Sequence, residues 1–168
     1  WSGPEPLSSG PLDDRDPGIC RAADGSILVN YFTNILALCG NSKENWRKTA
    51  ESISVETIVR EHNFWMKRST DNGKTWSGKY PIPVNNPHGP TPAKDGSLII
   101  AGRRVSPSSA YLCEGSRLGD SLAFARSVDN GLTWDVVSKI SAPEGHDSMN
   151  CFELYALEAA NGGIIVHI

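Results

Sequence analysis

Groups of ionisable side chains recur along the sequence, and their mixture of charges suits the binding of a polar or anionic small molecule. Guanidinium groups bind carboxylates through paired hydrogen bonds, whereas carboxylates and imidazoles can move protons. The histidines show no regular His-x-x-His spacing, so we predict neither a metal site nor a bound cofactor. The candidate residues are Arg15, Asp16, Arg60, Glu61, His62, His88, Arg103, Arg104, Asp120, His146, Asp147, Asn150 and Glu153.

An eight-residue phrase that occurs twice indicates how these residues are positioned. Its copies are Ser69–Trp76 and Ser127–Trp134, and their aspartates, Asp71 and Asp129, are 58 positions apart (129 − 71). Asp-Asn-Gly favours a tight turn, because Gly accepts a positive φ and Asp or Asn can bond to nearby backbone. The Trp that closes each copy has a large apolar ring to bury. We interpret both copies as β-hairpin turns with a structural aspartate and call them the first and second box turns.

A second repeat alternates with the box turns. Asp24-Gly25, Asp95-Gly96 and Asn161-Gly162 each precede an apolar run that is typical of a strand. The spacings between their glycines are 71 (96 − 25) and 66 (162 − 96). Hairpins of the two kinds in alternation predict a four-stranded antiparallel unit of about 60–70 residues, which is the blade of a β-propeller.

The sequence therefore predicts an all-β chain in which residues 1–168 form a partial propeller. Blade one covers about residues 15–84, blade two about 86–141, and the start of blade three about 147–168. Propellers use about four to eight blades, so about two and a half blades cannot close a ring. We interpret the chain as part of a longer propeller; an assembly of several partial propellers is the alternative.

The strand order assigns the loops to two faces. If the first strand of a blade descends, both the Asp-Gly turn and the box turn lie below. The longer loops and the connections between blades then lie above, where loops on a rigid scaffold commonly carry function. We expect the ionisable candidates on this upper face, together with a long polar insertion at residues 41–56.

Composition excludes other partners. The net charge is −3 (16 − 19). The sequence has no basic stripe, so we predict no binding of nucleic acid. No apolar run approaches the length of a membrane span. Cys20, Cys39, Cys113 and Cys151 form no C-x-x-C pair, so both a Cys39–Cys113 disulfide and buried free thiols stay open.

Both box turns match Ser-x-Asp-x-Gly-x-Thr-Trp, which resembles the Asp-box, or BNR repeat, of the sialidase superfamily. Arg15-Asp16-Pro17 resembles the Arg-Ile-Pro segment of that family, and His88-Gly89-Pro90 resembles the entry to its second blade. Glu153, before Asn161-Gly162, resembles the glutamate that partners the nucleophilic tyrosine. The resemblance implies a six-bladed propeller, of which this chain is an N-terminal portion, and a secreted or periplasmic location.

The resemblance also implies a glycan substrate and roles for particular residues. Arg15 corresponds to the first of three arginines that bind a carboxylate, and Glu153 to the partner of a tyrosine nucleophile. The acid/base catalyst of the family is an aspartate in the long loop of blade one, but no aspartate occurs between Asp24 and Asp71. Glu61 is nearest to that position, and a glutamate with a raised pKa can transfer the same proton. The weaker candidates for this role are Glu44, Glu51 and Glu56.

The predicted catalytic residues are thus Glu61 and Glu153. The predicted substrate-binding residues are Arg15, Asp16, His62, His88, Arg103, His146 and Asp147.

The predicted function is that of a sialidase-like glycoside hydrolase, an exo-glycosidase that acts on terminal sugars of glycans, acidic sugars included. The alternative is a non-catalytic propeller that binds glycan or protein partners, because the box turn is a folding device that need not accompany hydrolysis. In the family pattern the nucleophilic tyrosine and two arginines fall after Ile168. We therefore predict that the 168-residue chain alone is inactive, and we leave its oligomeric state open.

Overall fold

The computed structural model describes residues 3–34, 48, 51–104 and 121–168. Antiparallel strands make up most of the regular structure in these ranges, as the sequence predicts. The helix α2 (Val55–Glu61) occupies the end of the predicted polar insertion, where no helix was expected. Ser54 precedes the helix, and its side chain accepts a hydrogen bond from the Thr57 N–H and so caps the first turn. In the described part of the chain, no helix is long and apolar enough to cross a membrane.

The first sheet has four strands in the order of the chain. Every neighbouring pair is antiparallel, and a bulge between Arg15 and Gly18 interrupts the first strand. This is the four-stranded unit that the alternating turns predict. Its strands are β1 (Asp13–Arg21), β2 (Ile27–Asn34), β3 (Phe64–Ser69) and β4 (Tyr80–Pro81).

The second sheet repeats this order, but its inner strand is broken in two. Both short pieces, β5 and β6, pair with β7. Pro87 and Pro90 lie between them, and proline has no N–H for the strand ladder. The strands are β5 (Val84–Asn85), β6 (Thr91–Pro92), β7 (Leu98–Arg104), β8 (Leu122–Ser127) and β9 (Asp135–Ile140).

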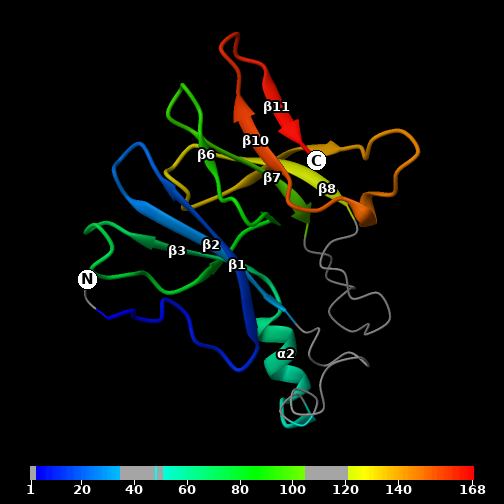
Figure 1. Cartoon of the computed structure of the whole chain (residues 1–168). Helices are drawn as coiled ribbons and strands as arrows, with labels where there is room; N and C mark the ends of the chain where they lie inside the picture. Colours follow the sequence, from blue (N-terminus) through cyan, green and yellow to red (C-terminus); the bar gives the residue numbers. More distant parts are fainter. Residues whose placement is uncertain (1–2, 35–47, 49–50, 105–120) are drawn as a thin grey trace.

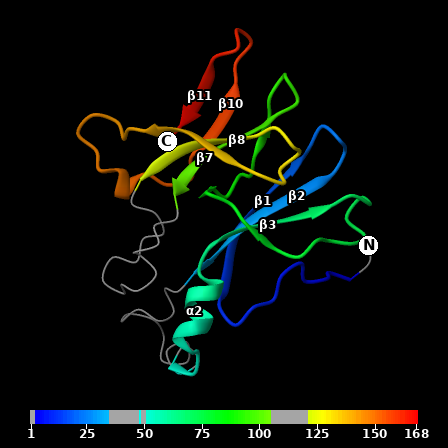
Figure 2. The same ribbon diagram turned by 180° about the vertical axis from the view of Figure 1, so that it is seen from behind.

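The third sheet is the hairpin of β10 (Tyr155–Glu158) and β11 (Ile164–His167), preceded by the short 3-10 helix η3 (Ser148–Asn150). The turns β1–β2, β6–β7 and β10–β11 lie on one side of the molecule, and α2 lies at the opposite end (Figures 1 and 2). The structure thus confirms the two faces inferred from strand order. The six-blade count and the blade limits stay predictions.

Both box turns have the same hydrogen bonds. In the first, the Ser69 hydroxyl donates to Asp71 Oδ1 (2.8 Å), which also accepts from the Thr75 N–H (2.9 Å). In the second, Ser127 and Thr133 bond to Asp129 at 2.8 and 2.9 Å. Hydrogen bonds from the Thr75 hydroxyl, the Thr75 N–H and the Ser69 hydroxyl lower the pKa of Asp71 to about 2. Both aspartates therefore have a structural role in their turns, as predicted.

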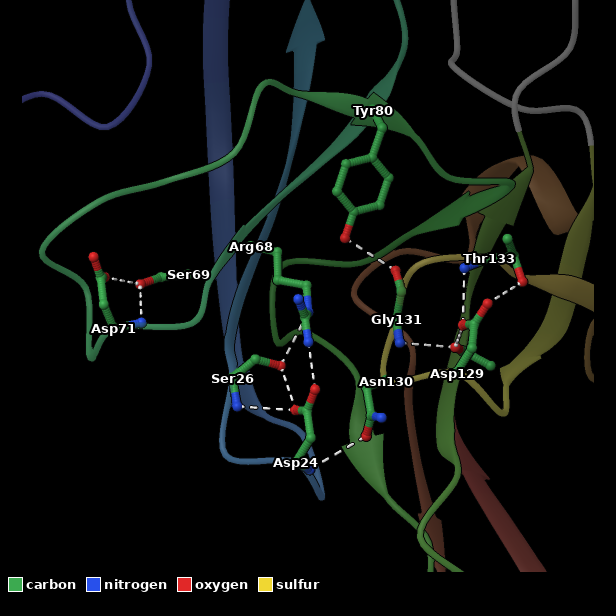
Figure 3. Close-up of polar contacts among 11 residues, drawn as sticks. Asp24, Ser26, Arg68, Ser69, Asp71, Tyr80, Asp129, Asn130, Gly131 and Thr133 are labelled. Carbon is green, nitrogen blue, oxygen red and sulfur yellow. Dashed lines mark hydrogen bonds and ion pairs between the residues drawn. The ribbon is translucent and has the colours of Figure 1, made fainter.

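The second box turn also joins the first sheet to the second (Figure 3). The Asn130 Oδ1 accepts a hydrogen bond from the Asp24 N–H (3.3 Å), and the Tyr80 hydroxyl donates to the Gly131 carbonyl (3.0 Å). A Cβ on Gly131 would lie 2.5 Å from Leu28 Cδ1, so the turn backbone packs directly on the first sheet. Trp134 packs against the hydrophobic core cluster of the first sheet that contains Leu28. The box turn thus stabilises the contact between neighbouring sheets.

Candidate functional site

The inner strands of the three sheets border a cleft of about 1180 Å³. Segments far apart in the sequence contribute to it: the bulge of β1, the β5–β6 connection, and the segment that leads into β10. Four of the candidate residues, His88, His146, Asn150 and Glu153, meet here. The described residues that line the cleft are Pro17, Gly18, Ile19, Pro87, His88, Pro143, His146, Asn150, Cys151, Phe152, Glu153, Tyr155, His167 and Ile168.

A buried network of asparagines holds the loop that carries His88. The Asn86 Oδ1 accepts hydrogen bonds from the backbone N–H groups of His88 (2.9 Å) and Gly89 (2.8 Å). Asn30 Nδ2, on β2, donates to Asn85 Oδ1 (2.6 Å) and to the Asn86 carbonyl (2.8 Å). All three asparagines are buried, and although Asn30 Oδ1 has no hydrogen-bond partner, buried hydrogen bonds of this kind restrain the backbone that they bind. His88 is therefore presented to the cleft on a rigid support.

Close backbone packing joins β1 to the same loop. A Cβ on Gly18 would lie 2.2 Å from the Gly89 nitrogen and 2.7 Å from the Asn30 Oδ1. Real side chains do not approach backbone this closely, so only glycine fits at position 18. The contact between these glycines brings the first two sheets together at the edge of the cleft.

Glu153 lies in the cleft in a strained backbone conformation, with a φ of +57°. Asp16 has a φ of +49° and lies in the bulge of β1. Each residue precedes the Asp or Asn of its hairpin turn by eight positions (24 − 16 and 161 − 153). Positive φ is uncommon for residues other than glycine, and such strain clusters at functional sites. The repeat thus places a strained carboxylate eight positions before the turn in β1 and again just before β10.

Two aromatic residues beside Glu153 complete this side of the cleft. The Tyr155 ring stands edge-on to the His88 ring, with 5.6 Å between centroids. Phe152 is 55% exposed, and the Arg103 guanidinium lies 4.9 Å from its ring centroid. Arg103 also donates to the Cys151 carbonyl (3.0 Å). The predicted ligand Arg103 therefore contacts the wall residues Cys151 and Phe152, and it is not among the residues that line the cleft.

Glu61 lies outside the cleft, at the end of α2. Its carboxylate accepts hydrogen bonds from Lys79 and from Arg60 Nε (2.8 Å), and its side chain is only 12% exposed. The Lys79 ammonium also lies 4.3 Å from the centroid of the Trp65 ring. Hydrogen bonds from Lys79 and then Arg60 lower the pKa of Glu61. Its carboxylate is therefore ionised at neutral pH, opposite to the raised pKa that a proton donor requires.

His62 follows Glu61 and is buried, with 6% of its surface exposed. Neither ring nitrogen has a hydrogen-bond partner, and burial lowers the pKa of the imidazole. Its backbone N–H closes α2 by donating to the Ile58 carbonyl (2.9 Å). His62 is therefore a buried residue that caps the C-terminal end of α2, and it does not line the cleft.

The remaining predicted residues lie around the cleft. Arg15 forms an ion pair with Asp13 (2.5 Å) next to the bulge whose Pro17 and Gly18 line the cleft. Asp147 lines a smaller cavity of about 370 Å³, which shares His146 with the cleft. Four residues named from the sequence, Glu44, Asp120, Cys39 and Cys113, lie outside the described residues. Cys20 and Cys151 are buried free thiols.

Phe152, Tyr155, His167 and Cys151 are among the cleft residues that were not predicted as ligands. Phe152 is adjacent to Glu153, and Tyr155 follows it by two positions, so proximity to a predicted carboxylate is a signal that could have found both. His167 carried no such signal, because its place follows from the pairing of β11 with Tyr155 of β10. The cleft offers one carboxylate, three imidazoles and two aromatic rings, which can bind a polar ligand with an apolar face. No cluster of three or more metal-ligating side chains occurs among the described residues.

Comparisons with known proteins identify relatives at low sequence identity. No family model matches the sequence. A sialidase of Paraclostridium sordellii is 26% identical over 149 residues, which cover 82% of this chain and 36% of that protein. The chain thus spans about a third of the length of this curated relative.

Two solved structures have a similar fold. A protein of unknown function from Dyadobacter fermentans aligns with a TM-score of 0.63 at 18% identity, over 99% of this chain and 46% of that one. The Hadza microbial sialidase Hz136 aligns with a TM-score of 0.52 at 18% identity, over 92% of this chain and 31% of that one. The chain therefore has an all-β fold that resembles a sialidase.

Proposed function

We propose that this chain supplies part of a sialidase-like glycoside hydrolase, which removes a terminal sugar from a glycan. The observation that carries the proposal is Glu153, a carboxylate held at a positive φ in a cleft where three sheets meet. The similarity to a sialidase supports it. A secreted or periplasmic location belongs to the same proposal.

The cleft residues divide into two kinds by their chemistry. The Glu153 carboxylate accepts a hydrogen bond or a proton from a hydroxyl group, which is the part expected of a carboxylate in glycoside hydrolysis. His88 and His146 donate hydrogen bonds to ligand oxygens. The rings of Tyr155 and Phe152 provide an apolar wall for the carbon skeleton of a sugar.

Binding of a sugar by the chain tests this proposal. We expect saturation-transfer NMR to detect contact with the α-methyl glycoside of N-acetylneuraminic acid in the wild-type chain and a weaker signal in Glu153→Gln. Glu5→Gln is the matched control, because Glu5 is exposed and does not line the cleft. Equal signals in both variants, or no signal in the wild type with any of a set of acidic and neutral methyl glycosides, would contradict the proposal.

The second candidate function is a non-catalytic propeller that binds glycan or protein partners. The lowered pKa of Glu61 favours it, because an ionised Glu61 cannot start hydrolysis by donating a proton. Both candidates predict that the chain alone does not release the fluorophore from a fluorogenic sialoside. A full-length polypeptide that contains this chain and cleaves the sialoside would favour the hydrolase, and one that binds the glycan without cleaving it would favour the binding module.

A further inference from the structure

Hydrolysis of a glycoside needs a proton donor, and the glutamates of α2 do not supply one. The glycosidic oxygen leaves as an alcohol only when an acid gives it a proton. Glu61 lies outside the cleft with a lowered pKa. Glu56, a weaker candidate, is exposed, and hydrogen bonds from its own backbone N–H and from the Ser54 hydroxyl lower its pKa too. The donor is therefore to be sought among the side chains that line the cleft.

Three imidazoles line the described part of the cleft, those of His88, His146 and His167. Histidine is the side chain whose charge ordinarily changes nearest to neutral pH, so it can both give and regain a proton there. A general acid must also be held within hydrogen-bond reach of the leaving oxygen. The three histidines differ in how firmly the surrounding structure holds them.

His88 is held both at its backbone and at its ring. Its N–H donates to the buried Asn86, whose Nδ2 in turn donates to the Ala101 carbonyl of β7 (2.6 Å). The Tyr155 ring, on β10, stands at 80° to the imidazole, with 5.6 Å between the centroids. The second sheet thus fixes the backbone of His88, and a side chain of the third sheet contacts its ring.

The other two imidazoles have less support. His146 is exposed in the connection between β9 and η3, and its N–H donates to the Pro143 carbonyl within the same connection (3.0 Å). His167 is exposed on β11. It pairs in register with Tyr155, but the described contact of the Tyr155 ring is with His88. His88 is therefore the best-positioned imidazole of the described cleft.

We propose that His88 is the general acid of the hydrolase and that Asn86 and Tyr155 are its positioning residues, an inference that rests on the proposed function. The imidazolium gives its N–H proton to the glycosidic oxygen while the bond from that oxygen to the anomeric carbon breaks. The leaving group departs as an alcohol, and water supplies the new hydroxyl group of the anomeric carbon. The remaining proton of that water restores the imidazolium.

The acidity of the leaving group distinguishes a proton donor from a residue that only binds the sugar. An alkyl leaving group needs a proton, whereas an aryl group leaves as a stable phenolate without one. The two substrates are the disaccharide of N-acetylneuraminic acid and galactose, and a fluorogenic aryl sialoside. In a full-length polypeptide that contains this chain, His88→Gln should lower kcat/KM at least about 100-fold for the disaccharide and less than about tenfold for the aryl sialoside.

Two further variants are matched to His88→Gln. His146→Gln removes an imidazole that only binds the ligand, so it should lower kcat/KM by the same factor for both substrates. Tyr155→Leu removes the ring that His88 contacts, and it should cause a smaller loss that is again confined to the disaccharide. The His88 side chain is exposed and Asn86 bonds to its backbone, so glutamine is compatible with the fold; circular dichroism checks this for each variant.

Three results would overturn the proposal. Equal losses for both substrates in His88→Gln would make His88 a binding residue only, while the hydrolase itself would stand. A loss confined to the disaccharide in Glu61→Gln or His146→Gln, and absent in His88→Gln, would assign the donor to that other residue. If the wild-type full-length polypeptide cleaves neither substrate, the proposed hydrolase is wrong, and the role of His88 as its donor is wrong with it.

Discussion

Replacement of Gly18 by alanine tests the contact that brings the first two sheets together beside the cleft. The new methyl carbon would lie 2.2 Å from the Gly89 nitrogen and 2.5 Å from its Cα, so backbone must move. Overpacking of this kind costs about 1–3 kcal/mol, and a clash with backbone favours the upper end. The lower entropy of the unfolded alanine chain offsets about 0.4–1 kcal/mol. We therefore expect a net loss of about 2 kcal/mol in the free energy of unfolding.

Urea denaturation followed by tryptophan fluorescence measures this change. A loss of about 2 kcal/mol in a chain of this size lowers the Tm by about 4–8 °C. The control is Gly78→Ala, since a Cβ there meets no atom within 4 Å, and it should be neutral or stabilising by up to about 1 kcal/mol. If Gly18→Ala unfolds within about 0.5 kcal/mol of the wild type, the close packing of Gly18 on Gly89 is not the constraint that the structure implies.

Three further changes test the electrostatics and the sheet contacts. Asn130→Ala should lower the free energy of unfolding by about 0.5–1.5 kcal/mol more than Asn72→Ala does. Both asparagines have a φ of +60°, but only Asn130 bonds to Asp24. Equal losses in urea denaturation would exclude that bond as a source of stability. The pKa of Asp71 is lowered from 3.8 to about 2. Its ionised carboxylate therefore stabilises the folded chain above about pH 4, and this stabilisation is lost as the pH falls toward 2. In Asp71→Asn, the free energy of unfolding should depend less steeply on pH in this acidic range. Burial lowers the pKa of His62 from 6.5, so as the pH falls the unfolded chain binds a proton at this residue before the folded chain does. The free energy of unfolding therefore decreases as the pH falls below about 6.5. His62→Phe should remove this part of the pH dependence, and an unchanged pH dependence would assign it to other groups.

Repeated local chemistry made the fold predictable. Each box turn fixes its own hairpin through hydrogen bonds within eight residues, so two copies of Ser-x-Asp-Asn-Gly-x-Thr-Trp suffice to predict two hairpins. The Asp-Gly turns follow the same logic through Ser26 and Ser97, whose backbone N–H groups donate to Asp24 and Asp95. The order of these turns along the chain then predicts four-stranded units and the face on which each turn lies.

The site was less predictable, because its geometry depends on contacts between sheets. Neither the buried contact of Asn30 with Asn85 nor the approach of Gly18 to Gly89 leaves a local pattern in the sequence. Arg60, Glu61 and His62 were all expected among the site residues on the upper face. The helix α2 instead directs Glu61 to Lys79 and places His62 in the core. Glu61 and His62 are adjacent in the sequence, but the end of α2 places them in different surroundings.

The charge state of Glu61 separates the two proposed functions most directly. Hydrolysis needs a group that is protonated at the working pH, whereas Lys79 and Arg60 lower the pKa of Glu61 and keep it ionised. A binding module needs no proton donor, so the cleft residues described above suffice for it. The hydrolase requires either release of Glu61 from both cations or a donor other than Glu61. Both proposed functions use Glu153, because a carboxylate in the cleft can bind a sugar hydroxyl whether or not a bond is later broken. Measurements on Glu153 therefore test the site, and measurements on Glu61 test the reaction.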